Sequence, residues 1–127
     1  MMRAKVETNK APQAVGPYSQ AIKANGFLFI SGQIPLDPQT GQMTALDIVA
    51  QTKQAMENLR AILEVEGLTF ADVVKTTIYL TDLQDFARVN ETYSLYFESD
   101  PPARSTVQVA ALPKGAKVEI EAVAALR

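Results

Sequence analysis

The spacing of apolar residues divides the chain into six predicted strands and two predicted helices. Residues 4–8 alternate enough to predict a short first strand. Two strand-like runs then flank Asn25-Gly26, a pair that tolerates the positive φ angles of a type I′ turn, so residues 19–31 predict a β-hairpin. The second run ends at Ser31–Pro35, and the turn-rich segment Asp37–Gly41 predicts a loop.

The middle of the chain predicts a long helix followed by a strand. The helix runs from about Asp47 to Glu66, because apolar residues recur there at three- and four-residue steps, namely Ile48, Ala55, Leu59, Ile62 and Leu63. Gly67 is a natural residue to end it. Thr69–Asp72 resembles a capping box around a single turn. The β-branched run Val73–Leu80 predicts the strand.

The last third predicts a second helix and two more strands. The helix opens at Thr81-Asp82 and must end before Asp100-Pro101, since the residue before a proline avoids helical backbone. Its apolar stripe consists of Phe86, Val89, Tyr93 and Phe97. Ser105–Ala110 and Lys117–Ala125 predict strands, the latter with Val118, Ile120, Ala122 and Ala124 on one face.

The predicted order is β-β-β-α-β-α-β-β, which indicates an α+β fold with a mixed sheet. Two helices can cover only one face of so large a sheet. The other face carries apolar or small residues such as Val123 and Ala125, so we expect a partner chain to cover it.

Length and composition limit the number of domains and exclude several kinds of chemistry. A chain of 127 residues predicts one domain over residues 1–127. It has no cysteine and no histidine, which excludes disulfides, thiol nucleophiles, zinc thiolate sites, imidazole ligands and a Ser-His-Asp triad. Acid–base chemistry is left to Asp, Glu, Lys, Tyr or a held water.

Charge and hydropathy argue against nucleic-acid and membrane partners. Twelve basic residues against 14 acidic ones give a net charge of −2, and no two basic residues are adjacent. The longest apolar runs, such as Ala122–Leu126, are too short to cross a membrane. Residues 1–7 lack the apolar stretch of a signal peptide, so we expect a cytoplasmic protein.

A few polar residues stand out as candidates for chemistry. Arg104 follows Pro101-Pro102-Ala103 at the start of a strand, where its guanidinium could bind a carboxylate or simply solvate the surface. Glu119 and Glu121 share a strand face and could serve as acid and base, although alternating glutamates also mark a solvated face.

Other polar positions are equally open. Tyr18 beside Gly16-Pro17 could donate at a pocket rim or pack at the core edge. Asn90 lies within the apolar stripe of the second helix and, if it is buried, needs hydrogen-bond partners, from a ligand or from the protein. Ser31-Gly32 could offer backbone N–H groups to a ligand or form a bulge. These residues alone indicate a small-molecule pocket with an arginine and a glutamate.

Six motifs, collinear over essentially the whole chain, resemble the RidA (Rid/YjgF) family of reactive-intermediate deaminases. They are Gly16–Ala21, Ile30–Ile34, Val74–Thr77, Asp85–Asn90, Pro102–Ser105, and Val109–Gly115 together with Val118–Ala124. The resemblance implies a chorismate-mutase-like fold and a homotrimer with a ligand cleft at each subunit interface. It also implies hydrolysis of 2-iminopropanoate and 2-iminobutanoate to 2-keto acids and ammonia, without a metal or organic cofactor.

The resemblance further implies roles for individual residues. Arg104 would bind the substrate carboxylate, and Glu119 would bind and orient the attacking water. Tyr18, Ser31, Gly32 and Asn90 would line the cleft, some of them from the neighbouring subunit. Thr106 would contribute backbone groups, at a position where many bacterial relatives carry cysteine, so any role of a thiol is lost.

Two other classes of function compete with the deaminase. One is an RNA-associated protein, such as a translation inhibitor or ribonuclease. The acidic balance of charge weighs against it. The other is a non-catalytic regulatory trimer that senses keto acids or holds unfolded clients without turnover.

Overall fold

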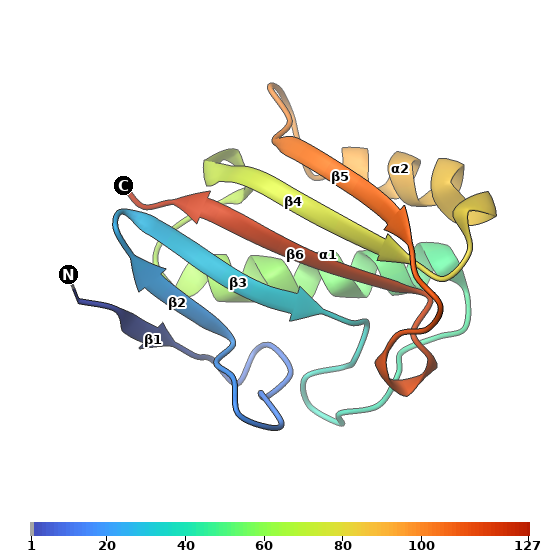
Figure 1. The fold of residues 1–127 in the computed structure, drawn as a ribbon, viewed down its shortest axis with the longest axis horizontal. Helices are drawn as coiled ribbons and strands as arrows, with labels where there is room; N and C mark the ends of the chain where they lie inside the picture. Colours follow the sequence, from blue (N-terminus) through green and yellow to red (C-terminus); the bar gives the residue numbers. More distant parts are fainter. Residues whose placement is uncertain (1) are drawn as a thin grey trace.

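The computed structural model describes residues 2–127, and Figure 1 shows the course of the chain. Its strands are β1 (Ala4–Val6), β2 (Ala21–Ala24), β3 (Phe27–Gln33), β4 (Val73–Leu80), β5 (Ala103–Gln108) and β6 (Val118–Ala125). Its α-helices are α1 (Ile48–Val65) and α2 (Phe86–Ser94). The order of elements along the chain is the predicted one.

All six strands form one twisted sheet in the order β1-β2-β3-β6-β4-β5. Neighbouring strands are antiparallel except β4 and β5, which are parallel and joined through α2. The sheet is therefore mixed, as the sequence predicts. The C-terminal strand β6 lies in its middle, between β3 and β4.

Helix α1 covers the core and begins and ends where the sequence predicts. The carboxylate of Asp47 accepts a hydrogen bond from the backbone N–H of Ala50 at 3.0 Å, which caps the first turn. Gly67 follows the helix with a φ of +69°, a conformation that glycine adopts readily. The apolar stripe of α1 is completely buried against inward-facing side chains of β3, β4 and β6, including Leu28, Ile78 and Ile120.

The capping box at Thr69 and Asp72 is also confirmed. The Thr69 side chain accepts a hydrogen bond from Ala71, and the Asp72 carboxylate accepts one from the Thr69 N–H. The turn Phe70–Asp72 leads directly into β4.

Several boundaries differ from the prediction. Strand β1 ends at Val6 rather than at residue 8. Asp82 caps a 3₁₀ turn, Leu83–Asp85, which precedes α2, and α2 ends at Ser94, well before the prolines. Its end is earlier because the chain turns there to pack Tyr96 and Phe97 against Phe70. Strand β5 spans Ala103–Gln108 rather than Ser105–Ala110, since its register with β4 already begins at Ala103.

Both helices lie on the same face of the sheet, behind it in Figure 1. No element of residues 2–127 covers the other face, here called the open face. Phe29 of β3 and Val107 of β5 are 46% and 43% exposed there, and Val123 of β6 lies opposite Phe29. An uncovered sheet face with apolar side chains is what the sequence predicts.

Candidate functional site

The guanidinium of Arg104 is held at the edge of the sheet by one face of α2. Its Nη1 donates to Oδ1 of Asn90 at 2.6 Å. The guanidinium carbon lies 5.5 Å from the ring centre of Phe86 and 5.2 Å from that of Tyr93. Asn90 is exposed. Its partner is Arg104.

Tyr93 is itself fixed in place. It is buried, and its hydroxyl shares a hydrogen bond of 2.7 Å with Oγ1 of Thr76. Thr76 is the residue of β4 that pairs with Arg104 in the sheet. The Tyr93 ring and the Arg104 backbone are thus tied to the same strand position.

Glu119 of β6 lies beside a bulge in β3. Ile30 pairs with Ala122 and Gln33 with Ile120, so Ser31 and Gly32 together oppose Glu121 alone. A Cβ atom on Gly32 would lie 2.8 Å from Cδ of Glu119 and closer still to its Oε2. The absence of a side chain at residue 32 is what lets the Glu119 carboxylate lie against the β3 backbone.

The environment of Glu119 favours its protonated form. Partial burial raises the pKa of its carboxyl group, and the neighbouring charge of Glu121 raises it further. Glu121 in turn accepts a hydrogen bond from the Tyr79 hydroxyl, which raises the pKa of that phenol. A carboxylate with a raised pKa is a stronger base when ionised, which suits it to accept a proton from water.

The bulge is also linked to the segment before β2. The Ser31 hydroxyl donates to the Ser19 carbonyl at 2.6 Å, and the Ser31 N–H donates to the Gln20 carbonyl at 2.9 Å. The buried carboxamide of Gln20 accepts from the N–H of Thr8 and donates to three carbonyls of residues 8–12. Tyr18, 54% exposed, projects from the segment held in this way.

Thr106 lies two residues after Arg104 on β5 and is half-buried. Its Oγ1 is buried and has no hydrogen-bond partner among residues 2–127.

The predicted site residues form two groups on opposite faces of the sheet. Arg104 pairs with Thr76, whose side chain lies under α2, whereas Glu119 pairs with Tyr79 on the open face. Arg104, Asn90 and Thr106 therefore belong to the helix face, and Glu119, Ser31 and Gly32 to the open face. One chain does not bring Arg104 and Glu119 together.

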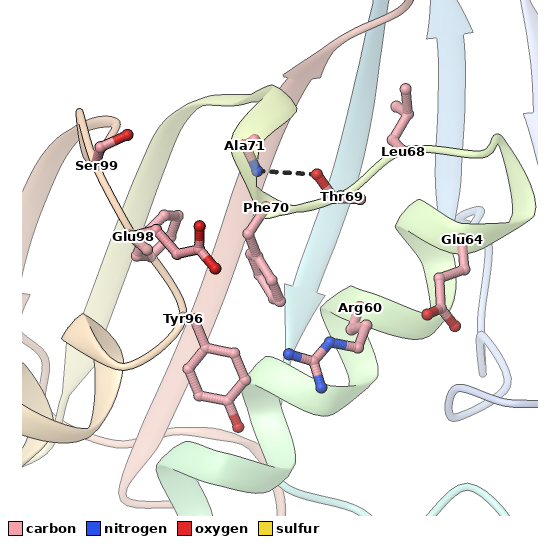
Figure 2. A pocket seen from close by; sticks show the side chains of 10 residues that line it. Arg60, Glu64, Leu68, Thr69, Phe70, Ala71, Tyr96, Glu98 and Ser99 are labelled. Atoms are coloured by element: carbon pink, nitrogen blue, oxygen red, sulfur yellow. Dashed lines mark hydrogen bonds between the residues drawn. The ribbon is translucent and has the colours of Figure 1, made fainter.

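Not every hollow of the surface contains predicted site residues. One of about 590 Å³ is lined by residues that include Tyr18 and Ser19. A shallow one of about 270 Å³ on the open face is lined by residues that include Ser19, Ser31 and Glu121. The hollow in Figure 2, about 430 Å³ between the end of α1 and the segment after α2, contains none of the predicted site residues. Across residues 2–127, no three Asp or Glu side chains gather as metal ligands would, and no helix is long and apolar enough to span a membrane.

Comparison with known proteins places the chain in a family. A family model described as Endoribonuclease L-PSP, that of the Rid/YjgF proteins, matches residues 8–126. The chain belongs to the Rid/YjgF family. The resemblance read from the six sequence motifs is therefore confirmed.

Relatives of this Rid protein carry several names. It is 57% identical over 126 residues to protein DfrA of Myxococcus xanthus, covering 98% of this chain and 96% of DfrA. It is 50% identical over 124 residues to the human 2-iminobutanoate/2-iminopropanoate deaminase, covering 98% and 90%. The crystal structure of E. coli TdcF with bound serine superposes with a TM-score of 0.93 at 45% identity, covering 98% and 99%. Fold and family are shared by all three.

Phe86 and Tyr93 are neighbours of Arg104 that the sequence did not single out. In the sequence they are visible only as members of an apolar stripe. Phe86 and Tyr93 lie four and three residues from Asn90, a spacing that could have indicated a shared helix face. This spacing does not indicate that Arg104, from a later strand, contacts the same face.

Proposed function

We propose that this protein hydrolyses 2-imino acids, among them 2-iminopropanoate and 2-iminobutanoate, to 2-keto acids and ammonia. The observation that carries the proposal is the guanidinium of Arg104, which belongs to the edge strand β5 and is held by a neutral amide and two rings. A guanidinium held in this way matches the planar carboxylate that every 2-imino acid carries. Deaminases of these two imino acids are among the chain's relatives.

The chemistry requires little beyond orientation and a held water. The C2 carbon of an imine is electrophilic, and attack by water forms a C–O bond while the C=N π electrons move to nitrogen. Glu119 accepts one proton from the attacking water and passes it to the imine nitrogen, which gives the carbinolamine. It then takes the proton of the carbinolamine hydroxyl and passes it to the same nitrogen, while the C=O bond re-forms and the C–N bond breaks. Ammonia therefore leaves with both protons of the water, and the keto acid remains. The raised pKa of Glu119 suits a group that takes up and returns one proton.

Arg104 and Glu119 can act on one substrate only if they come from different subunits. Within one chain they lie on opposite faces of the sheet. We therefore propose a homotrimer in which the open face of one subunit meets the β5 edge of the next. Tyr18, Ser31, Gly32, Asn90 and Thr106 would line the resulting cleft. We expect this reaction to occur in the cytoplasm.

The test is competition for a freshly generated imine. An amino-acid oxidase produces 2-iminopropanoate in the presence of a chemical trap, and the protein should lower the trapped fraction while it speeds pyruvate release. Arg104→Ala removes a charged bidentate contact of about 1.5–3 kcal/mol, which predicts a roughly tenfold to hundredfold loss of kcat/KM.

Arg88→Ala is the matched control. Arg88 lies on α2 with its side chain exposed and pairs with Asp85, three residues earlier. Its loss should leave turnover unchanged. A wild-type protein that leaves the trapped fraction unaltered, or an Arg104→Ala variant as active as Arg88→Ala, would contradict the proposal.

The description Endoribonuclease L-PSP makes RNA cleavage a second candidate. Phosphate contacts need basic residues, and the chain has a net charge of −2 with scattered lysines and arginines. A filter-binding assay over a range of salt concentrations tests it. Binding that weakens steeply with salt would support an RNA partner.

A further inference from the structure

Arg104 differs from three of the other four arginines of the chain in the charge of its partner. Arg60, Arg88 and Arg127 each pair with a carboxylate, of Glu57, Asp85 and Asp72 respectively. Among residues 2–127, no ion pair involves Arg104, whose hydrogen-bond acceptor is the neutral amide of Asn90. Its position is fixed without loss of its positive charge.

Three residues of α2 make this possible by their spacing. Phe86, Asn90 and Tyr93 are separated by four and three residues, so they lie on one face of the helix. Asn90 holds one nitrogen of the guanidinium, while the two rings lie within cation–π distance of its carbon. Contact with two rings and one amide restricts both the place and the plane of the group.

The two rings differ in how firmly they are set. Tyr93 is 4% exposed, bonded to Thr76 and in contact with the Phe97 ring, with ring centres 4.8 Å apart. Phe86 is 38% exposed, so it can be changed with little effect on the core. The contact between the Arg104 guanidinium and an aromatic ring can therefore be tested independently at the buried Tyr93 and at the more exposed Phe86.

Arg60 provides an internal comparison. Its guanidinium also lies near two rings, 5.6 Å from the centre of Phe70 and 5.2 Å from that of Tyr96 (Figure 2). Its Nη1, however, bonds both carboxylate oxygens of Glu57. The carboxylate of Glu57 neutralises the charge of Arg60. The amide of Asn90 carries no charge, so the positive charge of Arg104 remains available to a ligand.

We propose that Phe86 and Tyr93 are positioning residues that hold the Arg104 guanidinium ready to bind the carboxylate of a small acid. The role of that carboxylate as part of an imine substrate rests on the proposed function, but the positioning itself does not. Holding a long side chain before the ligand arrives reduces the entropy lost on binding. Loss of a ring should therefore weaken carboxylate binding although Arg104 is still present.

The experiment compares four variants with wild type: Phe86→Leu, Tyr93→Leu, Tyr93→Phe and Tyr96→Leu. Tyr93→Phe keeps the ring, and Tyr96→Leu removes a ring from Arg60 instead. Two quantities are measured on the intact protein. One is the hydrogen-exchange rate of the Arg104 Nε–H by NMR, and the other is the dissociation constant for pyruvate. Imine turnover is then measured to separate KM from kcat.

Both leucine variants at residues 86 and 93 should speed Nε–H exchange and weaken pyruvate binding by roughly five- to thirtyfold. Tyr93→Phe and Tyr96→Leu should stay within about twofold of wild type, because the rings beside Arg104 remain. KM should rise by a similar factor in the first two variants. Unchanged exchange and affinity in Phe86→Leu and Tyr93→Leu would overturn the proposal.

Failure of the proposed function gives a different pattern. A wild-type protein without imine turnover, whose pyruvate affinity still depends on Phe86 and Tyr93, would refute the deaminase and leave the positioning role intact. Loss of pyruvate binding in Tyr96→Leu as strong as in Phe86→Leu would overturn the positioning role, because it would indicate a general effect of aromatic residues.

Discussion

At the scale of single residues, Glu119 links structure most directly to a measurable pH dependence. Its pKa is raised first by burial and then by the charge of Glu121. If the ionised carboxylate accepts the proton of water, kcat/KM should rise as pH increases through this raised pKa and level off above it. Glu119→Gln should remove the acidic limb together with most of the activity. A Glu119→Gln variant that keeps the wild-type pH profile would show that another group is the base.

Glu121→Gln tests the smaller of the two causes that raise the pKa of Glu119, the charge of Glu121. An amide at residue 121 can still accept the Tyr79 hydrogen bond, but it no longer repels a charge on Glu119. The acidic limb should move to lower pH and remain above that of an ordinary glutamate, because burial persists. A shift to higher pH would contradict this assignment of causes.

The same raised pKa has a consequence for folding. A carboxyl group whose pKa is higher in the folded than in the unfolded state stabilises the fold only at low pH, and this contribution is lost as pH rises above the unfolded value. Glu119→Gln should therefore be more resistant to urea than wild type at neutral pH. The difference should disappear in acid.

Candidate residues could be found in the sequence, but their partners could not. Arg104 and Glu119 stand out because their residue types and local context suggest chemistry. That Asn90 is the acceptor for Arg104, or that Gly32 makes room for Glu119, depends on strands brought together from distant parts of the chain. Local spacing carries no signal for such contacts.

At the scale of elements, the bulge in β3 positions Glu119 and can be tested through Gly32. Gly32→Ala places a methyl group within 2.8 Å of Glu119 Cδ, so the carboxylate must move or the strand must shift. We expect about a tenfold or larger loss of kcat/KM, since misplacing a reacting group is costly. Kinetics of the purified variant, with urea unfolding as a check on the fold, provide the measurement.

A double variant shows whether this loss acts through Glu119. In a Glu119→Gln background, Gly32→Ala should cost little further activity, because the group that it displaces has already lost its function. Independent losses that multiply would mean that Gly32 acts in another way, for example through its backbone N–H.

Elements with strong local signals were predicted closely, and those set by tertiary packing were not. Helix α1 has both a cap residue and a terminating glycine, and β6 alternates along its whole length. The end of α2 has neither. It is determined by the packing of Tyr96 and Phe97 against Phe70, a contact with a residue far back in the chain. The start of β5 is likewise set by its register with β4.

At the scale of the whole molecule, the open face predicts association. Phe29 is 46% exposed there beside Val123, and burying such side chains favours assembly. Light scattering should give 3 × 13.8 = 41.4 kDa for a homotrimer.

Phe29→Asp should lower the mass toward one subunit and abolish imine turnover. Leu95→Asp, a matched change at a residue 74% exposed after α2, should alter neither. A wild-type mass of 13.8 kDa would refute the assembly.

The placement of Arg104 and Glu119 on opposite faces predicts complementation between inactive subunits. Arg104→Ala and Glu119→Gln trimers should each lose most of the wild-type activity, with about a tenth or less remaining in Arg104→Ala. After they are mixed, unfolded and refolded together, half of the subunits supply an intact Arg104 and half an intact Glu119. In the proposed trimer each cleft takes one residue from each of two neighbours, so about one quarter of the clefts should regain both. Turnover should then recover to about one quarter of the wild-type value. Sites built within single chains would give no recovery at all, since no subunit in the mixture carries both residues.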